Sequence, residues 1–274
     1  MKLAVFSVDG TKQLGAVQED RVFLLSEYPP CVKSFIESGE SIPSLEGRPS
    51  HHLADVAVHI PIAAPEKIIC VGLNYIDHCR ETGMEPPKSP VIFSKYANAL
   101  TGHNSDVEIP VNSKEVDFEA ELAIVIGKEA KRVSEEEAEE YVFGYTIMND
   151  VSARDLQFAD GQWSRGKTAD TFAPTGPYVV TRDEVGDPHN LSISLTLNGE
   201  IMQDSNTSNL IFTVPQIISF LSQSMTLKPG DLIATGTPPG VGMGRSPKVW
   251  LKNGDQMEVT IEKIGTLSNR VRGH

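Results

Sequence analysis

The sequence predicts a β-rich α+β protein with a small N-terminal domain and a larger β domain. Short apolar runs separated by Gly and Pro clusters recur along most of the chain, which is typical of strands joined by turns. Helical periodicity is confined to a few short segments, and a Pro/Gly/Ser-rich stretch at 42–50 separates the first group of strands from the rest. The 274 residues suffice for two modest domains. We therefore predict domains at 1–62 and 63–274.

Composition excludes several partners. Lys plus Arg total 24 and Asp plus Glu total 37, a formal charge of −13 that argues against nucleic acid and against polybasic membrane attachment. No apolar run approaches the roughly 18 residues of a membrane span. The first ten residues contain too short an apolar run for a signal peptide, and the three cysteines form no CxxC pair. These observations predict a cytoplasmic protein without disulfides or a thiolate zinc site.

The N-terminal domain is predicted as a small meander followed by a helix. Its first 25 residues contain three strand-like runs, LAVFSV, LGAV and RVFLL, with an Asp-Gly turn at 9–10 between the first two. Residues 32–38 (VKSFIES) predict one short helical stretch.

The larger domain is predicted to contain at least eight strands and two helices. The strand-like runs are KIICVGL, PVIFSKY, ELAIVIG, YVFGYTIMND, GPYVV, SISLTLNG, DLIATGT and QMEVTIEKIG. A Ser N-cap followed by glutamates predicts a helix at 134–141, and apolar residues at helical spacing predict another at 214–222. The Gly-rich segment 236–244 lacks a GK[ST] motif and contains consecutive prolines, so it does not indicate a nucleotide site.

The segment DFEAELAIVIG carries two glutamates, Glu119 and Glu121, on one side of a predicted strand. Two residues along a strand separate them by about 7 Å. The same side continues into Ala123 and Val125, so two acids stand at the edge of a buried face and repel unless a cation lies between them. A metal site and a strand with water-facing acids both remain compatible with this segment.

A third carboxylate favours the metal site. The apolar strand before Asn149 ends abruptly at Asp150, at the kind of strand end where ligands bind. Three carboxylates suit a hard cation such as Mg²⁺ or Mn²⁺, whereas zinc normally recruits His or Cys.

Six motifs occur in an order that closely resembles the fumarylacetoacetate hydrolase superfamily: GLNYIDHCRE, DFEAEL, MNDVSARDLQ, GKTADTFAPTGP, LNGE and DLIATGTPPGVG. The resemblance extends from about residue 65 to the C-terminus, and the residues before it resemble the small domain of many bacterial members. It implies a mixed β-sandwich roll and a homodimer. It also implies that Glu119, Glu121 and Asp150 bind the divalent metal.

The resemblance assigns further roles. His78 and Glu81 match a general-base dyad on a mobile lid, and residues three apart on a helical turn are neighbours. Lys167 matches a lysine near the metal that can hold a carboxylate or enolate. Arg154, Gln157 and Thr237 match polar residues expected to bind a 2-oxo acid substrate. The Pro-rich stretch 81–90 belongs to the lid. Its sequence does not show which chemical group forms the end of the substrate farthest from the metal.

These residues predict a metal-dependent hydrolase that cleaves a carbon–carbon bond in acylpyruvate-type 2,4-dioxo acids, with His78 activating water. Two alternatives use the same site: decarboxylation of oxaloacetate and isomerisation of 2-hydroxyhepta-2,4-diene-1,7-dioate. Another class, a non-catalytic metal-binding protein, would have no need of the lid histidine or Lys167.

Overall fold

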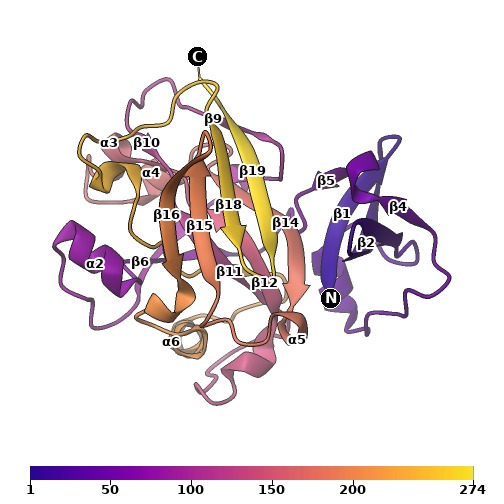
Figure 1. Cartoon of the computed structure of the whole chain (residues 1–274). Coiled ribbons are helices and arrows are strands. Elements are labelled where there is room, and N and C mark those ends of the chain that lie inside the picture. Colours follow the sequence, from indigo (N-terminus) through magenta and orange to yellow (C-terminus); the bar gives the residue numbers. More distant parts are fainter. Residues whose placement is uncertain (274) are drawn as a thin grey trace.

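The computed structural model describes residues 1–273 and consists mainly of β-sheet (Figure 1). The largest sheet has the order β4-β3-β2-β1-β14-β12-β11-β17-β6-β7, with β5 paired to β1 and β8 to β14. Its strands are β1 (Lys2–Val8), β2 (Thr11–Gln18), β3 (Arg21–Leu24), β4 (Ser50–His52), β5 (Ala57–His59), β6 (Ile68–Gly72), β7 (Val91–Lys95), β8 (Leu100–Thr101), β11 (Ala120–Ile126), β12 (Val142–Asn149), β14 (Ala173–Thr181) and β17 (Leu232–Ala234).

A second sheet packs against the first and completes a β-sandwich. Its order is β16-β15-β18-β19-β9, formed by β9 (Asp106–Glu108), β15 (Ser192–Leu197), β16 (Glu200–Asn206), β18 (Gln256–Ile261) and β19 (Gly265–Arg272). Figure 1 shows it in front of β11, β12 and β14. Strand β18 alternates exposed and buried residues because one face meets solvent, whereas every residue of β11 is buried. The predicted β-rich fold class is confirmed.

Helices are short and few. They are α1 (Val32–Ser38), α2 (Ile76–Thr82), α3 (Arg154–Gln157), α4 (Ser164–Lys167), α5 (Arg182–Val185) and α6 (Val214–Ser224). The predictions at 32–38 and 214–222 are confirmed, and Thr213 caps α6 through a capping box. None of the helices in residues 1–273 is long and apolar enough to cross a membrane.

The helix predicted at 134–141 is wrong in type and extent. Only Ala138–Tyr141 is helical, as a 3₁₀ turn. The Ser134 hydroxyl donates to the Glu137 carboxylate instead of capping a helix. Neighbouring glutamates repel one another on a helix, and Ala138 is the only buried residue of the turn, so little packing stabilises a longer helix.

The first 59 residues supply β1 to β5 and α1, including the predicted three-stranded meander. Strand β1 pairs with β14 at Lys2 and Val180, so these strands continue the main sheet. Leu3 and Val5 pack into the main core, while Phe6, on the other face of β1, belongs to a small separate cluster. Figure 1 shows this end of the molecule on the side opposite α2. A domain boundary near residue 63 stays a prediction.

Four adjacent strands bring chemically active residues to one edge of the main sheet. Strand β11 begins where its antiparallel neighbour β12 ends, with Ala120 opposite Asn149. On its other side β11 pairs with β17, which runs parallel to β6. The start of β11 and the ends of β12, β17 and β6 therefore lie side by side.

Candidate active site

The three predicted metal ligands converge at this edge. The Asp150 amide donates to the Glu119 carbonyl at 2.9 Å, which continues the β11–β12 ladder by one residue pair. One carboxylate oxygen from each of Glu119, Glu121 and Asp150 lies within 4.8 Å of the others, and all three residues are buried. Glu119 just before β11, Glu121 on β11 and Asp150 just after β12 thus form one cluster of oxygen donors.

Two buried cations compensate Glu119. Lys167 Nζ lies 2.8 Å from Glu119 and 2.9 Å from Asp150, and Arg154 Nη2 lies 2.5 Å from Glu119. Burial alone would raise the pKa of Glu119, but Lys167 and Arg154 outweigh burial and hold that pKa well below its ordinary value. Burial lowers the pKa of Lys167, but Asp150 and Glu119 raise it by more, so this pKa lies above its ordinary value. Lys167 therefore stays an ammonium.

Among residues 1–273, Glu121 forms no ion pair with a lysine or arginine, whereas Glu119 forms two. Its Oε2 accepts a 2.8 Å hydrogen bond from the backbone amide of Gly236, a residue just beyond β17 whose φ of 103° lies in a region that favours glycine. Burial, Asp150 and Glu119 together raise the pKa of Glu121 well above its ordinary value. With Glu121 ionised, the buried carboxylates at this site number four when Asp117 is counted, and they face three buried cations, Lys95, Arg154 and Lys167.

The donor set fits a divalent cation. Asp150 Oδ1 is fully buried and accepts no hydrogen bond from the residues that the structure describes, although Lys95 Nζ is 2.6 Å away. A buried carboxylate oxygen without a hydrogen-bond donor is costly unless a metal or another charge compensates it. Three carboxylates with an unshared oxygen suit a hard cation such as Mg²⁺ or Mn²⁺.

Helix α2 carries the His78–Glu81 pair that the family resemblance predicted. His78 Nδ1 lies 2.9 Å from Glu81 Oε2, and the Gly240 amide donates to Glu81 Oε1 at 2.8 Å. Burial raises the pKa of Glu81, but the hydrogen bonds from His78 and Gly240 outweigh burial and lower it overall. Glu81 therefore remains a carboxylate that accepts from Nδ1–H, which places the imidazole lone pair on Nε2.

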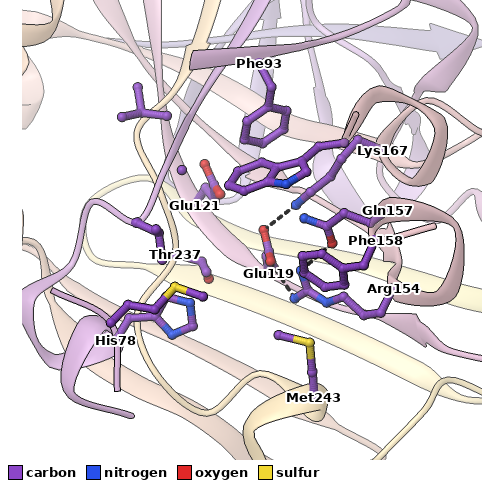
Figure 2. Close-up of a pocket in the computed structure, with 15 residues that line it drawn as sticks. His78, Phe93, Glu119, Glu121, Arg154, Gln157, Phe158, Lys167, Thr237 and Met243 are labelled. Atoms are coloured by element: carbon purple, nitrogen blue, oxygen red, sulfur yellow. Dashed lines mark hydrogen bonds and ion pairs between the residues drawn. The ribbon is translucent and has the colours of Figure 1, made fainter. Parts of the chain in front are cut away.

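One cavity joins the dyad to the carboxylates. It encloses about 590 Å³ of empty space including its mouth. His78, Glu119, Glu121, Arg154, Gln157, Lys167 and Thr237 all line it. Figure 2 shows His78 and Lys167 on opposite sides, with Glu119 between them. Every predicted site residue except Glu81 and Asp150 is thus in the cavity wall, and each of these two contacts a lining residue.

The predicted substrate-binding residues are oriented by hydrogen bonds. Gln157 Oε1 accepts from Arg154 Nη1 at 2.9 Å, which leaves the Gln157 amide NH₂ as a donor. Thr237 Oγ1 accepts from Gln203 Nε2 at 2.9 Å, which leaves the Thr237 hydroxyl hydrogen to donate elsewhere. The polar end of the cavity therefore offers donors from several directions.

Sequence reasoning missed three buried residues at this site. Asp117 accepts from Arg154 Nε and from the amide of Gly242. Gln203 joins the start of β11 to Thr237, and Lys95 contacts Asp150. Asp117 stood inside a recognised motif and Lys95 in a strand-like run, whereas Gln203 lies in β16, a strand that the predicted runs did not include. For Lys95, a polar residue within a strand-like run was the available signal.

Residues 67–272 match the family described as "Fumarylacetoacetate (FAA) hydrolase C-terminal". The chain belongs to this family. Two solved structures cover the whole of this chain: a fumarylacetoacetate hydrolase from Exiguobacterium antarcticum, 36% identical with a TM-score of 0.92 over all of that chain, and a 2-hydroxyhepta-2,4-diene-1,7-dioate isomerase from Mycobacterium marinum, 39% identical with a TM-score of 0.84 over 98% of that chain. The expected fold family is confirmed.

Curated relatives refine the expected activity. The rat protein named "Oxaloacetate tautomerase Fahd2a, mitochondrial" is 46% identical over 250 residues, 89% of this chain and 80% of the relative. As a member of this family of enzymes, the chain is itself an enzyme, so the predicted alternative of a non-catalytic metal-binding protein is wrong. The main prediction was a hydrolase of carbon–carbon bonds. The names of the relatives support the alternative prediction, an isomerase, better.

The predicted cytoplasmic location is wrong by the same comparison. The rat relative and those from Bos taurus and Homo sapiens are all named mitochondrial proteins. Cysteines that form no disulfide are compatible with any reducing compartment, so they could not distinguish one such compartment from another.

Proposed function

We propose that this enzyme is a divalent-metal-dependent isomerase that interconverts the keto and enol forms of small 2-oxo acids, with oxaloacetate as the first substrate to test. The observation that carries the proposal is the His78–Glu81 pair facing the Glu119, Glu121 and Asp150 carboxylates across one cavity. Keto–enol exchange needs a base that moves a proton at C3 and a site that stabilises negative charge on the C2 oxygen. No water molecule needs to enter the reaction.

The proton moves through His78. In the keto-to-enol direction, Nε2 takes the C3 proton while Nδ1–H donates to Glu81, whose negative charge stabilises the imidazolium formed. The proton is then delivered to the C2 oxygen, so that one C–H bond is exchanged for one O–H bond. Glu81 is itself held by the Gly240 amide, which fixes the orientation of the ring.

The polar end of the cavity binds and orients the 2-oxo carboxylate. Lys167 and Gln157 are the donors that we assign to the substrate, and Arg154 holds both Glu119 and Gln157 in place. Glu119, Glu121 and Asp150 would hold Mg²⁺ or Mn²⁺, which when bound supplies a Lewis acid that withdraws electrons from the 2-oxo group. The Thr237 hydroxyl donates from the side opposite Gln157 (Figure 2).

The purified enzyme with Mg²⁺ or Mn²⁺ should accelerate the ketonisation of freshly dissolved enol oxaloacetate, because the cavity supplies both the base and the charge stabilisation. Loss of the ultraviolet absorbance of the enol follows the reaction, and a chelator should return the rate to the uncatalysed value. Pyruvate is measured in parallel with lactate dehydrogenase. Pyruvate release at the rate of enol loss would instead identify a decarboxylase.

A hydrolase remains the second candidate, because the Exiguobacterium structure described as a fumarylacetoacetate hydrolase superposes over the whole chain. Hydrolysis would use His78 to activate water for attack at C4 of an acylpyruvate. Acetopyruvate distinguishes the two candidates, since only hydrolysis converts it to acetate and pyruvate.

A homodimer, implied by the family resemblance, is part of the same proposal and is testable by light scattering.

The segment 76–90 should behave as a lid that closes over bound ligand. The hydrogen bonds that join α2 to the body include Gly240 to Glu81, and Ser205 and Asn209 to Asp77. Beyond it the prolines 86, 87 and 90 exclude a longer helix. Oxalate with Mg²⁺ mimics the chelating end of an enolate, so it should slow amide hydrogen exchange in 76–90.

Helix α1 serves as the control for lid closure, because it has the same length as α2 and contributes no residue to the cavity. Its exchange should not respond to oxalate. Equal exchange in 76–90 with and without oxalate and Mg²⁺ would contradict closure.

A further inference from the structure

Lys95, the last residue of β7, is a buried lysine to which the proposed mechanism gives no role. Its side chain is 0% exposed. The ammonium donates three hydrogen bonds to main-chain carbonyls: Val151 at 3.0 Å, Lys167 at 2.6 Å and Phe172 at 2.8 Å. An ammonium group has three N–H donors, so these carbonyls use all of them.

The three carbonyls belong to the segments that form the active site. Val151 directly follows the proposed metal ligand Asp150, and Lys167 is the cation between Glu119 and Asp150. Phe172 stands immediately before β14. One ammonium therefore fixes the backbone on both sides of the carboxylate cluster.

The same ammonium also faces the Asp150 side chain. Asp150 Oδ1 lies 2.6 Å from Lys95 Nζ, while Asp150 Oδ2 lies 2.9 Å from Lys167 Nζ. Asp150 Oδ1 and the three carbonyl oxygens thus lie within 3.0 Å of one ammonium, whose charge compensates the carboxylate. The two lysines thus hold the carboxylate from both oxygens and leave a lone pair of Oδ1 for a metal.

We propose that Lys95 is a positioning residue, which holds the Asp150 carboxylate and the Lys167 backbone in the arrangement that binds the divalent cation. The inference rests on the proposed metal site but not on the reaction or substrate assigned to it. It concerns a residue outside all the motifs that indicated the site.

Two effects of removing Lys95 oppose each other, and their balance makes the proposal testable. A positive charge beside a cation site repels the cation, so charge removal alone would tighten metal binding. Loss of the ammonium also leaves three buried carbonyls unpaired and releases Asp150 from its fixed position. Residues that orient metal ligands typically contribute about 10- to 100-fold in metal affinity, and we expect positioning to outweigh repulsion.

The test is a calorimetric titration of the full-length protein with Mn²⁺. Lys95→Met keeps the length of the side chain and removes its charge and donors, and it should weaken Mn²⁺ binding by about 10- to 100-fold. Lys67→Met is the matched control, because Lys67 pairs with the buried Asp231 at 3.3 Å before β17, away from the metal ligands. It should lower the melting temperature and leave Mn²⁺ affinity at the wild-type value.

A second variant covers the case in which Lys95→Met does not fold. Lys95→Gln retains two N–H donors for the carbonyls without the charge, and its Mn²⁺ affinity should lie between those of wild type and Lys95→Met. Wild-type or tighter affinity in a folded variant would overturn the positioning role, as would failure of both variants to fold, which would make Lys95 a residue of the core alone. Wild-type protein that binds Mn²⁺ without accelerating enol loss would overturn the proposed function and leave this inference standing.

Discussion

Replacing Glu121 by Gln should weaken Mg²⁺ or Mn²⁺ binding by at least about 100-fold and at the same time raise the melting temperature of the metal-free enzyme. The first effect follows from losing one of three charged ligands. The second follows because Glu121 is a buried carboxylate next to Asp150 and Glu119 without a cation of its own. A Gln side-chain oxygen can still accept the hydrogen bond from the Gly236 amide, so the variant loses repulsion but no hydrogen bond.

The two effects should depend on pH in a defined direction. Burial and the neighbouring carboxylates raise the pKa of folded Glu121 well above its ordinary value of 4.5. Between these two pKa values the folded metal-free protein binds a proton that the unfolded chain has released, so the contribution of Glu121 to the free energy of unfolding falls as pH rises. Metal binding needs the carboxylate, so metal affinity should rise with pH over the same window.

Glu119→Gln is the matched control, since it removes a ligand only two residues away but with the opposite effect on stability. Lys167 and Arg154 lower the pKa of Glu119, so neutralising it leaves two buried cations undercompensated. Both variants should lose metal affinity, while only Glu119→Gln should melt below wild type. Thermal melts and Mn²⁺ titrations from pH 5 to 8 measure both quantities. Undiminished metal affinity in Glu121→Gln would rule out Glu121 as a ligand.

Local patterns predicted the strand skeleton and the carboxylate cluster. The alternation in DFEAELAIVIG placed Glu119 and Glu121 on one side of a strand, and the abrupt end of the next apolar run singled out Asp150. Antiparallel pairing of β11 with β12 then brings the two strand ends together. The family resemblance singled out His78 and Glu81, and the contact between them needs only a single helical turn because residues three apart on a helix are neighbours.

The supporting residues could not be predicted because their roles depend on long-range contacts. Lys95 is 55 positions before Asp150 in the chain and appeared as one polar residue in a strand-like run. Gln203 reaches Ala120 and Thr237 only because the second sheet packs over the first. Short strands such as β8, β10 (Val116–Asp117) and β13 (Ser152–Ala153) have two residues each, too few for any periodicity to be detected.

Replacing His78 by Ala should reduce the rate of keto–enol exchange by about 10²- to 10⁴-fold, the usual contribution of a general base. His78 lines the cavity and is oriented by Glu81, which itself depends on the Gly240 amide. None of these contacts involves Glu119, Glu121 or Asp150, so Mn²⁺ affinity should stay within a few-fold of wild type. Glu81→Gln should cause a smaller loss, because the ring remains but loses the charge that stabilises its protonated form.

His52→Ala provides the control for a histidine paired with a carboxylate outside the active site, because His52 lies 3.2 Å from Asp20 among the N-terminal strands. Its rate should equal that of wild type. The decisive comparison is the loss of enol absorbance at saturating Mn²⁺ for the three variants. In the described part of the chain, His78 is the only imidazole that lines the cavity. A His78→Ala rate within a few-fold of wild type would therefore require a different acceptor for the C3 proton. In that case Lys167, the remaining titratable nitrogen besides Arg154 in the cavity wall, would be the next group to replace.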